Sequence, residues 1–209
     1  MRLLTLDEDN TKDILSLAVE LLKNGGIIAY STETFYGLGA KFDSDAALRK
    51  IYEIKQRPQD KAMPLIIGER DLLPVIAVGV SSTASALMDK FWPGPLTLII
   101  PAGKKISEYI TAGTHTVAVR IPGESFALRL AQTAHFPITA TSANPSGLPP
   151  ALDAETVLRY FGDRIDLIID AGPTPGGLPS TIVDVSGATM KVLREGVIDG
   201  KSLGGLPFS

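Results

Sequence analysis

Apolar and polar residues follow one another along the first sixty positions in a pattern that predicts helices and strands in turn. Apolar residues recur at helical spacing from 14 to 22, and Gly25–Gly26 supplies the stop signal of that helix. The apolar run 27–29 predicts a short strand covered on both faces. Helical spacing returns after Ser44, the expected cap of a second helix, which should end near Pro58. This alternation favours an α/β fold.

The remaining patterns continue the same order. Further strands are expected at 3–6, 64–66, 96–100, 116–120, 138–141, 167–170, 180–185 and 191–194. Further helices are expected at 71–75, 81–91, 124–134 and 155–161. No repeat or linker-like composition interrupts the pattern, so residues 1–209 are predicted to form one domain with a short flexible tail over about 199–209.

Composition narrows the class of protein. The 209 residues are 44% apolar and 21% charged, as in ordinary globular proteins, and no apolar run approaches the roughly 20 residues needed to span a bilayer. The first residues lack the features of a secretory signal, and a chain without cysteine has no disulfide, Cys nucleophile or Cys-ligated zinc. We therefore expect a cytoplasmic protein without membrane association. The net charge of −3 argues against a dedicated nucleic-acid binder.

A turn rich in hydroxyl groups and the cations that follow it form the first candidate site. Ser31-Thr32-Glu33-Thr34 stands at the end of a predicted strand, where ligands of open α/β sheets usually bind. Lys55 falls at the edge of the apolar stripe of its helix, and Arg57 and Lys61 follow it closely. Three converging cations suit an anionic ligand such as a polyphosphate. A solvated basic helix end is the alternative for a Lys-x-Arg pair taken alone.

Two later strand ends carry further candidates. Arg120 lies on the strand face opposite Val117 and Val119, at the carboxyl end, where its fork could bind a carboxylate; a surface arginine is the alternative. Ser142-Ala143-Asn144 ends another strand with groups that bind phosphate or ribose oxygens, or that simply form a turn. Trp92, before a proline turn, is interpreted as a core residue.

These segments resemble the Sua5/YrdC/YciO family. The resemblance extends from Gly26 to Gly196 and rests on Ser-Thr-Glu-Thr-Phe-Tyr-Gly-Leu-Gly from Ser31, Lys-Gln-Arg-Pro from Lys55, Ser-Ala-Asn from Ser142 and Leu-Arg-Glu-Gly from Leu193. The Lys-x-Arg pair marks the threonylcarbamoyl-AMP synthase branch and is not kept in the YciO-like branch. The family usually has Pro where Ser31 stands. It often has Ser near Pro149-Pro150, where proline offers neither hydroxyl nor N–H, so Pro150 is given no role.

The resemblance implies a YrdC-like twisted open sheet of mixed strands with flanking helices around a basic cavity. It also implies a short, single-domain nucleotidyltransferase that makes L-threonylcarbamoyladenylate and pyrophosphate from L-threonine, bicarbonate and ATP. The product would pass to a separate tRNA threonylcarbamoyl transferase, for the t6A modification of adenosine 37 in tRNA. Mg²⁺ would arrive with ATP, because His115 and His135 are too isolated for a metal site built by the protein.

The same resemblance implies roles for individual residues. Lys55 and Arg57 would be catalytic, and Thr32, Arg120 and Ser142 would bind threonine. The nucleotide would contact Arg57, Lys61, Thr116, Ser142, Asn144 and Arg194. Such a reaction brings three anionic reactants together, so it needs fixed cations more than a nucleophile.

Three points stay open at this stage. A structured-RNA-binding module would use the small basic excess of residues 41–61, although the chain lacks an aromatic platform for single strands; in a synthase, RNA binding would be weak. A YciO-like paralogue would act on another substrate, and Lys55 and Arg57 argue against it. The Gly- and Pro-rich segment 171–179 is either a lid or an ordinary loop.

Overall fold

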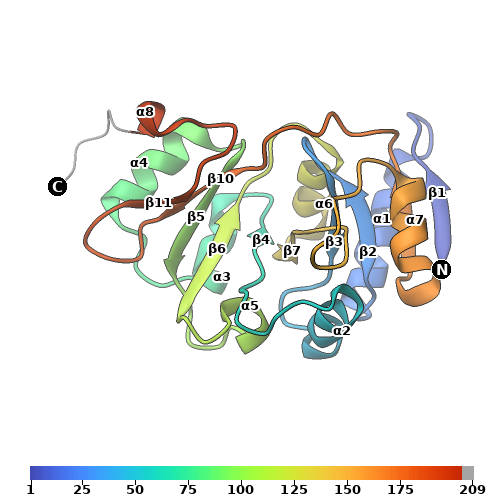
Figure 1. Ribbon diagram of the computed structural model, residues 1–209, viewed down its shortest axis with the longest axis horizontal. Coiled ribbons are helices and arrows are strands. Elements are labelled where there is room, and N and C mark those ends of the chain that lie inside the picture. Colours follow the sequence, from blue (N-terminus) through green and yellow to red (C-terminus); the bar gives the residue numbers. More distant parts are fainter. Residues whose placement is uncertain (204–209) are drawn as a thin grey trace.

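The computed structural model describes residues 1–203 and shows a mixed α/β fold with two sheets (Figure 1). The first sheet has the order β1-β9-β2-β3-β8 and the second the order β11-β10-β5-β6-β4-β7. The first contains β1 (Arg2–Thr5), β2 (Ile28–Ser31), β3 (Tyr36–Gly39), β8 (Thr141–Ser142) and β9 (Leu167–Asp170). The second contains β4 (Leu65–Ile66), β5 (Leu96–Pro101), β6 (Thr116–Arg120), β7 (Ile138–Thr139), β10 (Thr181–Asp184) and β11 (Lys191–Arg194).

The prediction of an α/β fold with mixed strands is therefore confirmed, but the expectation of a single sheet is wrong. Both sheets mix parallel and antiparallel pairs. The predicted strand 138–141 is divided between them, because the chain leaves the second sheet after Thr139 and enters the first at Thr141. Between these strands, the amide of Ala140 donates to the carbonyl of Pro64 at 2.8 Å. This crossing places the two sheets side by side.

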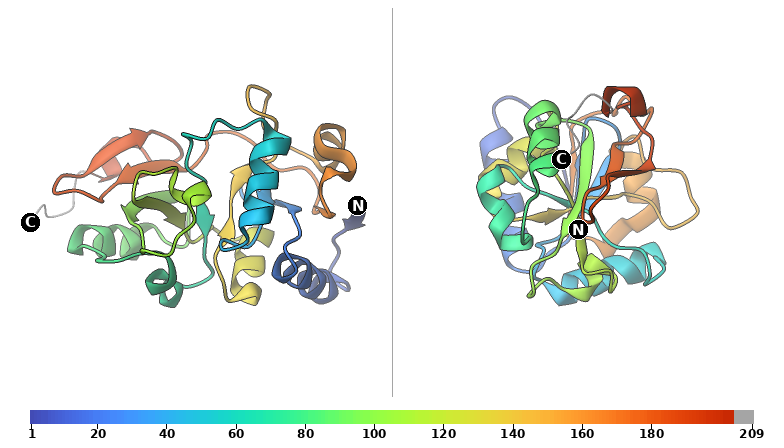
Figure 2. Two further views of the ribbon diagram at one scale, coloured as in Figure 1. Left: turned by 90° about the horizontal axis from the view of Figure 1, so that it is seen from below. Right: turned by 90° about the vertical axis from the view of Figure 1, so that its left-hand side faces the viewer.

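Helices cover the sheets from two sides (Figure 2). They are α1 (Thr11–Lys23), α2 (Asp45–Lys55), α3 (Leu73–Ile76), α4 (Ser82–Phe91), α5 (Glu108–Thr111), α6 (Phe126–Ala134), α7 (Ala154–Phe161) and α8 (Gly200–Leu203), with 3-10 turns at Arg70–Leu72 and Gly162–Arg164. Leu22 of α1 and Leu130 of α6 pack with Ile28 and Ile169 in one apolar cluster. The larger cluster joins α2 and α7 to the other face and contains Trp92, which is buried as predicted. No helix within residues 1–203 is long and apolar enough to cross a bilayer.

The helix ends follow their capping residues. Ser81 and Asp153 accept hydrogen bonds from the amides of Ala84 and Thr156, at 3.1 and 2.7 Å. Ser44 stands at the N-cap position of α2, as expected, but its side chain makes no capping bond and its backbone departs from the extended geometry typical of a cap. The helix expected from 124 begins instead at Phe126, since the hydroxyl of Ser125 accepts from the third amide along the chain.

The end of the described chain packs against β10. The buried hydroxyl of Thr181 accepts from the amides of Gly196 and Ile198, both at 3.0 Å, and donates to the carbonyl of Ile198 at 2.6 Å. Within the tail predicted over about 199–209, residues 200–203 form α8 and Leu203 is fully buried. The rest of that tail, 204–209, lies outside the described residues.

Candidate anion-binding site

A cavity of about 340 Å³ lies where the two sheets meet. Its walls come from both sheets, including Tyr36 of β3 and Ser142 of β8 on one side and Thr97 of β5 and Ile182 of β10 on the other. Three arginines also line it: Arg57, Arg120 and Arg194. No aspartate or glutamate occurs among the described residues of its lining. Three guanidinium groups in one concave site favour an anionic ligand with several negative oxygens.

Arg57 is held beside the end of α2. Gln56 adopts a left-handed conformation with φ of 50° and turns the chain out of the helix. The Arg57 guanidinium then donates through Nε to the carbonyl of Lys61 at 3.0 Å and through Nη2 to that of Ala62 at 2.6 Å. These bonds fix its planar group next to Thr141 of β8, with Nη1 3.5 Å from the hydroxyl.

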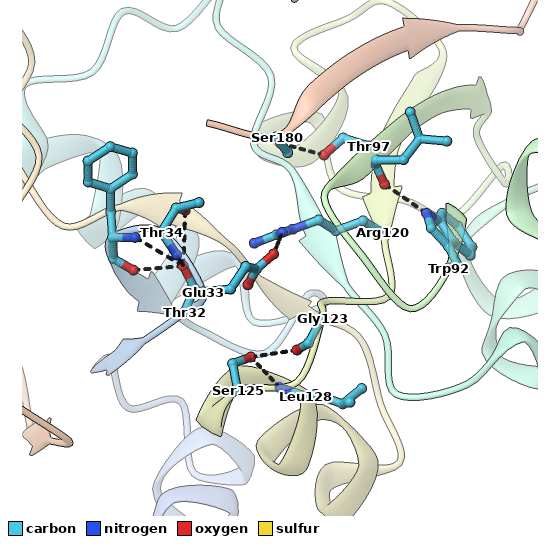
Figure 3. A network of polar contacts seen from close by, with 12 residues as sticks. Thr32, Glu33, Thr34, Trp92, Thr97, Arg120, Gly123, Ser125, Leu128 and Ser180 are labelled. Atoms are coloured by element: carbon cyan, nitrogen blue, oxygen red, sulfur yellow. Dashed lines mark hydrogen bonds and ion pairs between the residues drawn. The ribbon is translucent and has the colours of Figure 1, made fainter. Parts of the chain in front are cut away.

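Arg194 reaches the cavity from the last strand of the second sheet. Its Nε and Nη2 donate to the carbonyl of Ser180 at 3.1 and 2.9 Å, and Nη2 also donates to the Ser180 hydroxyl at 3.1 Å. That hydroxyl lies 2.9 Å from the hydroxyl of Thr97 (Figure 3). Burial, followed by the nearby Arg120 guanidinium, lowers the pKa of Arg194. An anion bound between the two guanidinium groups would relieve this repulsion.

Arg120 crosses the space between the sheets from the carboxyl end of β6. Its strand neighbours Val117 and Val119 are buried on the opposite face, as predicted from their alternation. In Figure 3 its guanidinium points toward Glu33, and Nη1 forms an ion pair with Oε1 of that carboxylate. Only 10% of the Arg120 side chain and 19% of the Glu33 side chain are exposed, so the pair is screened far less than one at the surface.

The turn at Thr32 forms the opposite wall. The Thr32 hydroxyl donates to the carbonyl of Phe35 at 2.8 Å and accepts from the amides of Thr34 and Phe35, both at 3.2 Å. Because this hydroxyl already organises the turn, Thr32 shapes the wall as well as contributing polar surface to it. Ser142, the other predicted threonine-binding hydroxyl residue, lines the cavity at the end of β8.

Lys55 is buried and is not among the described lining residues of the cavity. Its ammonium donates to the carbonyl oxygens of Ser142 and Asn144, the latter at 2.6 Å, and its own carbonyl accepts from the amide of Ser146 at 2.7 Å. Burial, followed by the Arg57 guanidinium, lowers the pKa of Lys55 to about 7. The Lys-x-Arg motif at Lys55 and the Ser-Ala-Asn motif at Ser142 are thus hydrogen-bonded to one another.

The other predicted nucleotide residues stand outside the described lining of the cavity. Asn144 donates to the carbonyls of Pro145 and Leu148 at 3.0 and 2.6 Å, and its buried Oδ1 has no partner among the described residues. Lys61 is exposed at the surface. Thr116 lies at the other end of β6 from Arg120, where its hydroxyl is 2.8 Å from that of Thr114.

Several polar residues of the site escaped the sequence analysis. Thr97 of β5 and Ser180, just before β10, fall in predicted strands that carried no assigned role, and the parallel pairing of β5 with β10 brings them together. The sequence feature that could have identified Thr97 is the alternation along β5. Thr97 and Ile99 face the cavity, whereas Leu98 is buried in the core. Glu33 lies within the motif that begins at Ser31, but no pattern in a single sequence pairs it with Arg120, so the sequence predicts no role for it.

The segment 171–179 is fastened at several points. The hydroxyl of Tyr36 donates to the carbonyl of Gly172 at 2.7 Å, and the amide of Gly176 donates to that of Thr34 at 2.9 Å. Thr174 donates twice to the carbonyl of Leu152, and Pro179 lines the cavity. In this structure the segment is therefore a bonded loop that forms part of the cavity wall.

No group of three or more His, Cys, Asp or Glu side chains within residues 1–203 is arranged to hold a metal ion. Since Mg²⁺ prefers oxygen ligands such as carboxylates and phosphates, an ion in this arginine-lined cavity would depend on oxygens brought by a nucleotide.

The fold and the cavity define a class: a two-sheet α/β domain with an arginine-lined cavity where the sheets meet. The family model described as Telomere recombination (Sua5_yciO_yrdC) matches residues 20–196. The chain belongs to the Sua5/YciO/YrdC family.

Relatives and solved structures agree with this membership. Proteins named threonylcarbamoyl-AMP synthase from Bacillus subtilis and Vibrio parahaemolyticus are 40% and 34% identical, over 92% and 90% of this chain and 56% and 100% of their own lengths. A synthase from Pyrococcus abyssi is 38% identical over 87% of this chain and 54% of its own length. The chain thus spans just over half the length of the Pyrococcus and Bacillus relatives.

Two solved structures superpose closely. Pyrococcus abyssi Sua5 complexed with L-threonine has a TM-score of 0.89 at 36% identity, covering 94% of this chain and 58% of its own. Escherichia coli YciO has a TM-score of 0.84 at 28% identity and covers 96% of this chain and 97% of its own. The fold is thus shared with both branches of the family.

Proposed function

We propose that this protein is an L-threonylcarbamoyladenylate synthase, a nucleotidyltransferase that forms threonylcarbamoyl-AMP and pyrophosphate from L-threonine, bicarbonate and ATP. The observation that carries the proposal is the convergence of Arg57, Arg120 and Arg194 on one cavity. The names of the relatives and the threonine complex of the Pyrococcus protein support it. The proposal includes a cytoplasmic location and transfer of the product to a tRNA threonylcarbamoyl transferase.

Each reactant has a partner of suitable charge. The carboxylate of threonine binds Arg120, because a guanidinium fork matches a carboxylate in two parallel bonds. Arg57 and Arg194 neutralise the phosphates of ATP, with Mg²⁺ held mainly by those phosphates. Bicarbonate lies near Ser142, where the predicted threonine and nucleotide sites meet. Lys61, Thr116 and Asn144 remain candidates for the nucleotide, although they lie outside the cavity lining in this structure.

The reaction needs positioning more than a protein nucleophile. The amino group of threonine forms a bond to the carbon of bicarbonate and gives a carbamate, with loss of water. A carbamate oxygen then attacks the α-phosphorus, and the bond to pyrophosphate breaks. Fixed guanidinium groups hold the anionic partners together and stabilise the charge that develops on the phosphoryl oxygens.

Pyrophosphate release tests this function. Purified protein is incubated with ATP, Mg²⁺ and bicarbonate, with and without L-threonine. We expect release that needs both threonine and bicarbonate, together with an adenylate of the expected mass. Folded protein that binds ATP but releases no pyrophosphate would favour a YciO-like activity on another substrate, which the similarity to YciO over both chains makes the second candidate. Protein that does not bind ATP would contradict both and make structured RNA the next ligand to test.

A further inference from the structure

The Glu33 carboxylate has one oxygen in an ion pair and one without a partner. Oε1 contacts Nη1 of Arg120. Oε2 is buried and has no hydrogen-bond donor among residues 1–203. A buried ionised oxygen that lacks a donor costs free energy, and native structures rarely keep one. Its presence beside a candidate site points to a donor that a ligand would supply.

This carboxylate stands between the cavity and a second hollow. Thr32 and Thr34, its neighbours in sequence, line the cavity together with Arg120. Glu33 itself lines the second hollow, of about 460 Å³, which also includes Thr32. The ion pair in Figure 3 therefore joins a residue that lines the cavity, Arg120, to one that lines the second hollow, Glu33.

The charges of this pair are the reverse of those of an α-amino acid. Such a molecule carries a carboxylate and an ammonium on the same carbon, so its binding site needs a cation and an acceptor side by side. Within residues 1–203 the Arg120 guanidinium has no hydrogen-bond partner other than Glu33, which leaves its other N–H groups for a carboxylate. Oε2 of Glu33 supplies the matching acceptor for an ammonium N–H.

We propose that Glu33 is a substrate-binding residue whose Oε2 accepts a hydrogen bond from the α-ammonium of the amino acid while Arg120 binds the carboxylate. The inference rests on the proposed function and adds the recognition of the amino group. The negative charge of Glu33 would also keep the phosphates of the nucleotide away from the position of the amino acid. A phosphate near Arg120 would meet the negative charge of Glu33, whereas Arg57 and Arg194 have no carboxylate in ion-pair contact within the described chain. The Glu33–Arg120 pair therefore favours binding of a zwitterionic α-amino acid over binding of a phosphate.

The first test uses the unaltered protein. Calorimetric titration compares L-threonine with 3-hydroxybutyrate, which keeps the carboxylate and the hydroxyl of threonine but lacks its ammonium. Because hydrogen bonds to charged groups are among the stronger ones, we expect threonine to bind roughly tenfold to hundredfold more tightly. Equal affinities would overturn the proposal, whatever any variant does.

The second test removes the negative charge. Glu33→Gln should lower the preference for threonine over 3-hydroxybutyrate to near one, and Glu33→Asp should keep part of it. Glu124→Gln is the matched control, since Glu124 also lines the second hollow but is exposed and paired with Arg129. Full selectivity in a folded Glu33→Gln variant, checked by circular dichroism, would also overturn the proposal.

Different results would contradict the synthase activity and the role of Glu33. Threonine-dependent pyrophosphate release without any preference for the ammonium would leave the synthase intact and remove the role of Glu33. Absence of threonine binding together with absence of pyrophosphate release would contradict the synthase, and the role of Glu33 with it.

Discussion

The ammonium of Lys55 donates a 2.6 Å hydrogen bond to the backbone carbonyl of Asn144 and a second bond to that of Ser142. This relationship joins the end of α2 to the loop after β8, two parts of the chain almost ninety residues apart. The two bonds hold in place the loop that carries the candidate ligand groups of Ser142 and Asn144. In this structure Lys55 positions the site, whereas Arg57 faces the ligand space.

Substitution of Lys55 by Ala should damage both the fold and the activity. The variant leaves two carbonyls without their donor, and each unsatisfied buried group costs about 1–3 kcal/mol of the free energy of unfolding. We expect a lower urea midpoint and a loss of pyrophosphate release of about tenfold or more. Lys50→Ala, at an exposed position of α2, is the control and should change neither quantity. Near-normal activity of Lys55→Ala would contradict the positioning role.

The depressed pKa of Lys55 makes stability depend on pH. Its folded pKa is about 7, below the value of roughly 10.4 in an unfolded chain. Between these values the unfolded state binds more protons, so the free energy of unfolding should rise with pH from about 7 to 10. Urea midpoints at pH 7 and 9.5 measure this rise in the unaltered protein and in Lys55→Met. The urea midpoint should rise less between these pH values in Lys55→Met than in the unaltered protein. An equal rise in both proteins would contradict the prediction.

Tyr30 and Tyr36 should reverse the increase in the free energy of unfolding at alkaline pH. Burial, followed by the charge of Asp170, raises the pKa of Tyr36 to about 12, and burial raises the pKa of Tyr30 as well. Each contributes stability below pH 10 that is lost as the pH rises through the folded pKa. The free energy of unfolding should therefore pass through a maximum near pH 10. Tyr36→Phe should weaken the decline above that pH.

Loss of Arg194 should weaken nucleotide binding. The variant Arg194→Ala removes a fixed cation that Ser180 holds at the cavity wall, and charged hydrogen bonds of this kind correspond to roughly tenfold to hundredfold in affinity. Titration with ATP in the presence of Mg²⁺ gives the dissociation constant. Arg159→Ala, an exposed arginine on α7, should retain the affinity of the unaltered protein. Similar ATP affinities for both variants would remove Arg194 from the nucleotide site.

Gly68 is required by packing. A Cβ at this position would lie 2.5 Å from the backbone of Gln132, in α6. Since neither backbone can yield without displacing the helix, Gly68→Ala should lower the free energy of unfolding by about 1–3 kcal/mol or more. Gly187→Ala is the matched control, because a Cβ there meets open space. Chemical denaturation of both variants measures the difference, and equal midpoints would contradict it.

The sequence was most informative where local chemistry decides the structure. The stop after α1 and the placement of Arg120 on the strand face opposite Val117 and Val119 both follow from spacing within one element. The division into two sheets does not, because it depends on where the chain crosses at Ala140.

The same limit applies to the site. Arg57, Arg120 and Arg194 could be singled out from their motifs, and the structure brings all three together. The direction of the Lys55 side chain and the pairing of Glu33 with Arg120 arise only when segments about ninety residues apart pack against one another. The hydroxyl pair of Thr97 and Ser180 depends in the same way on strand pairing.

Both sheets contribute residues to the cavity wall, so a bound ligand should couple the unfolding of one sheet to that of the other. A ligand that contacts Thr32 or Ser142 on one side and Arg120 or Arg194 on the other connects the two sheets physically. Its binding free energy adds to the stability of the state in which both are folded and docked, and not to states in which either has opened. Substrate should therefore sharpen thermal unfolding as well as raise its midpoint, so that the two sheets melt as one unit.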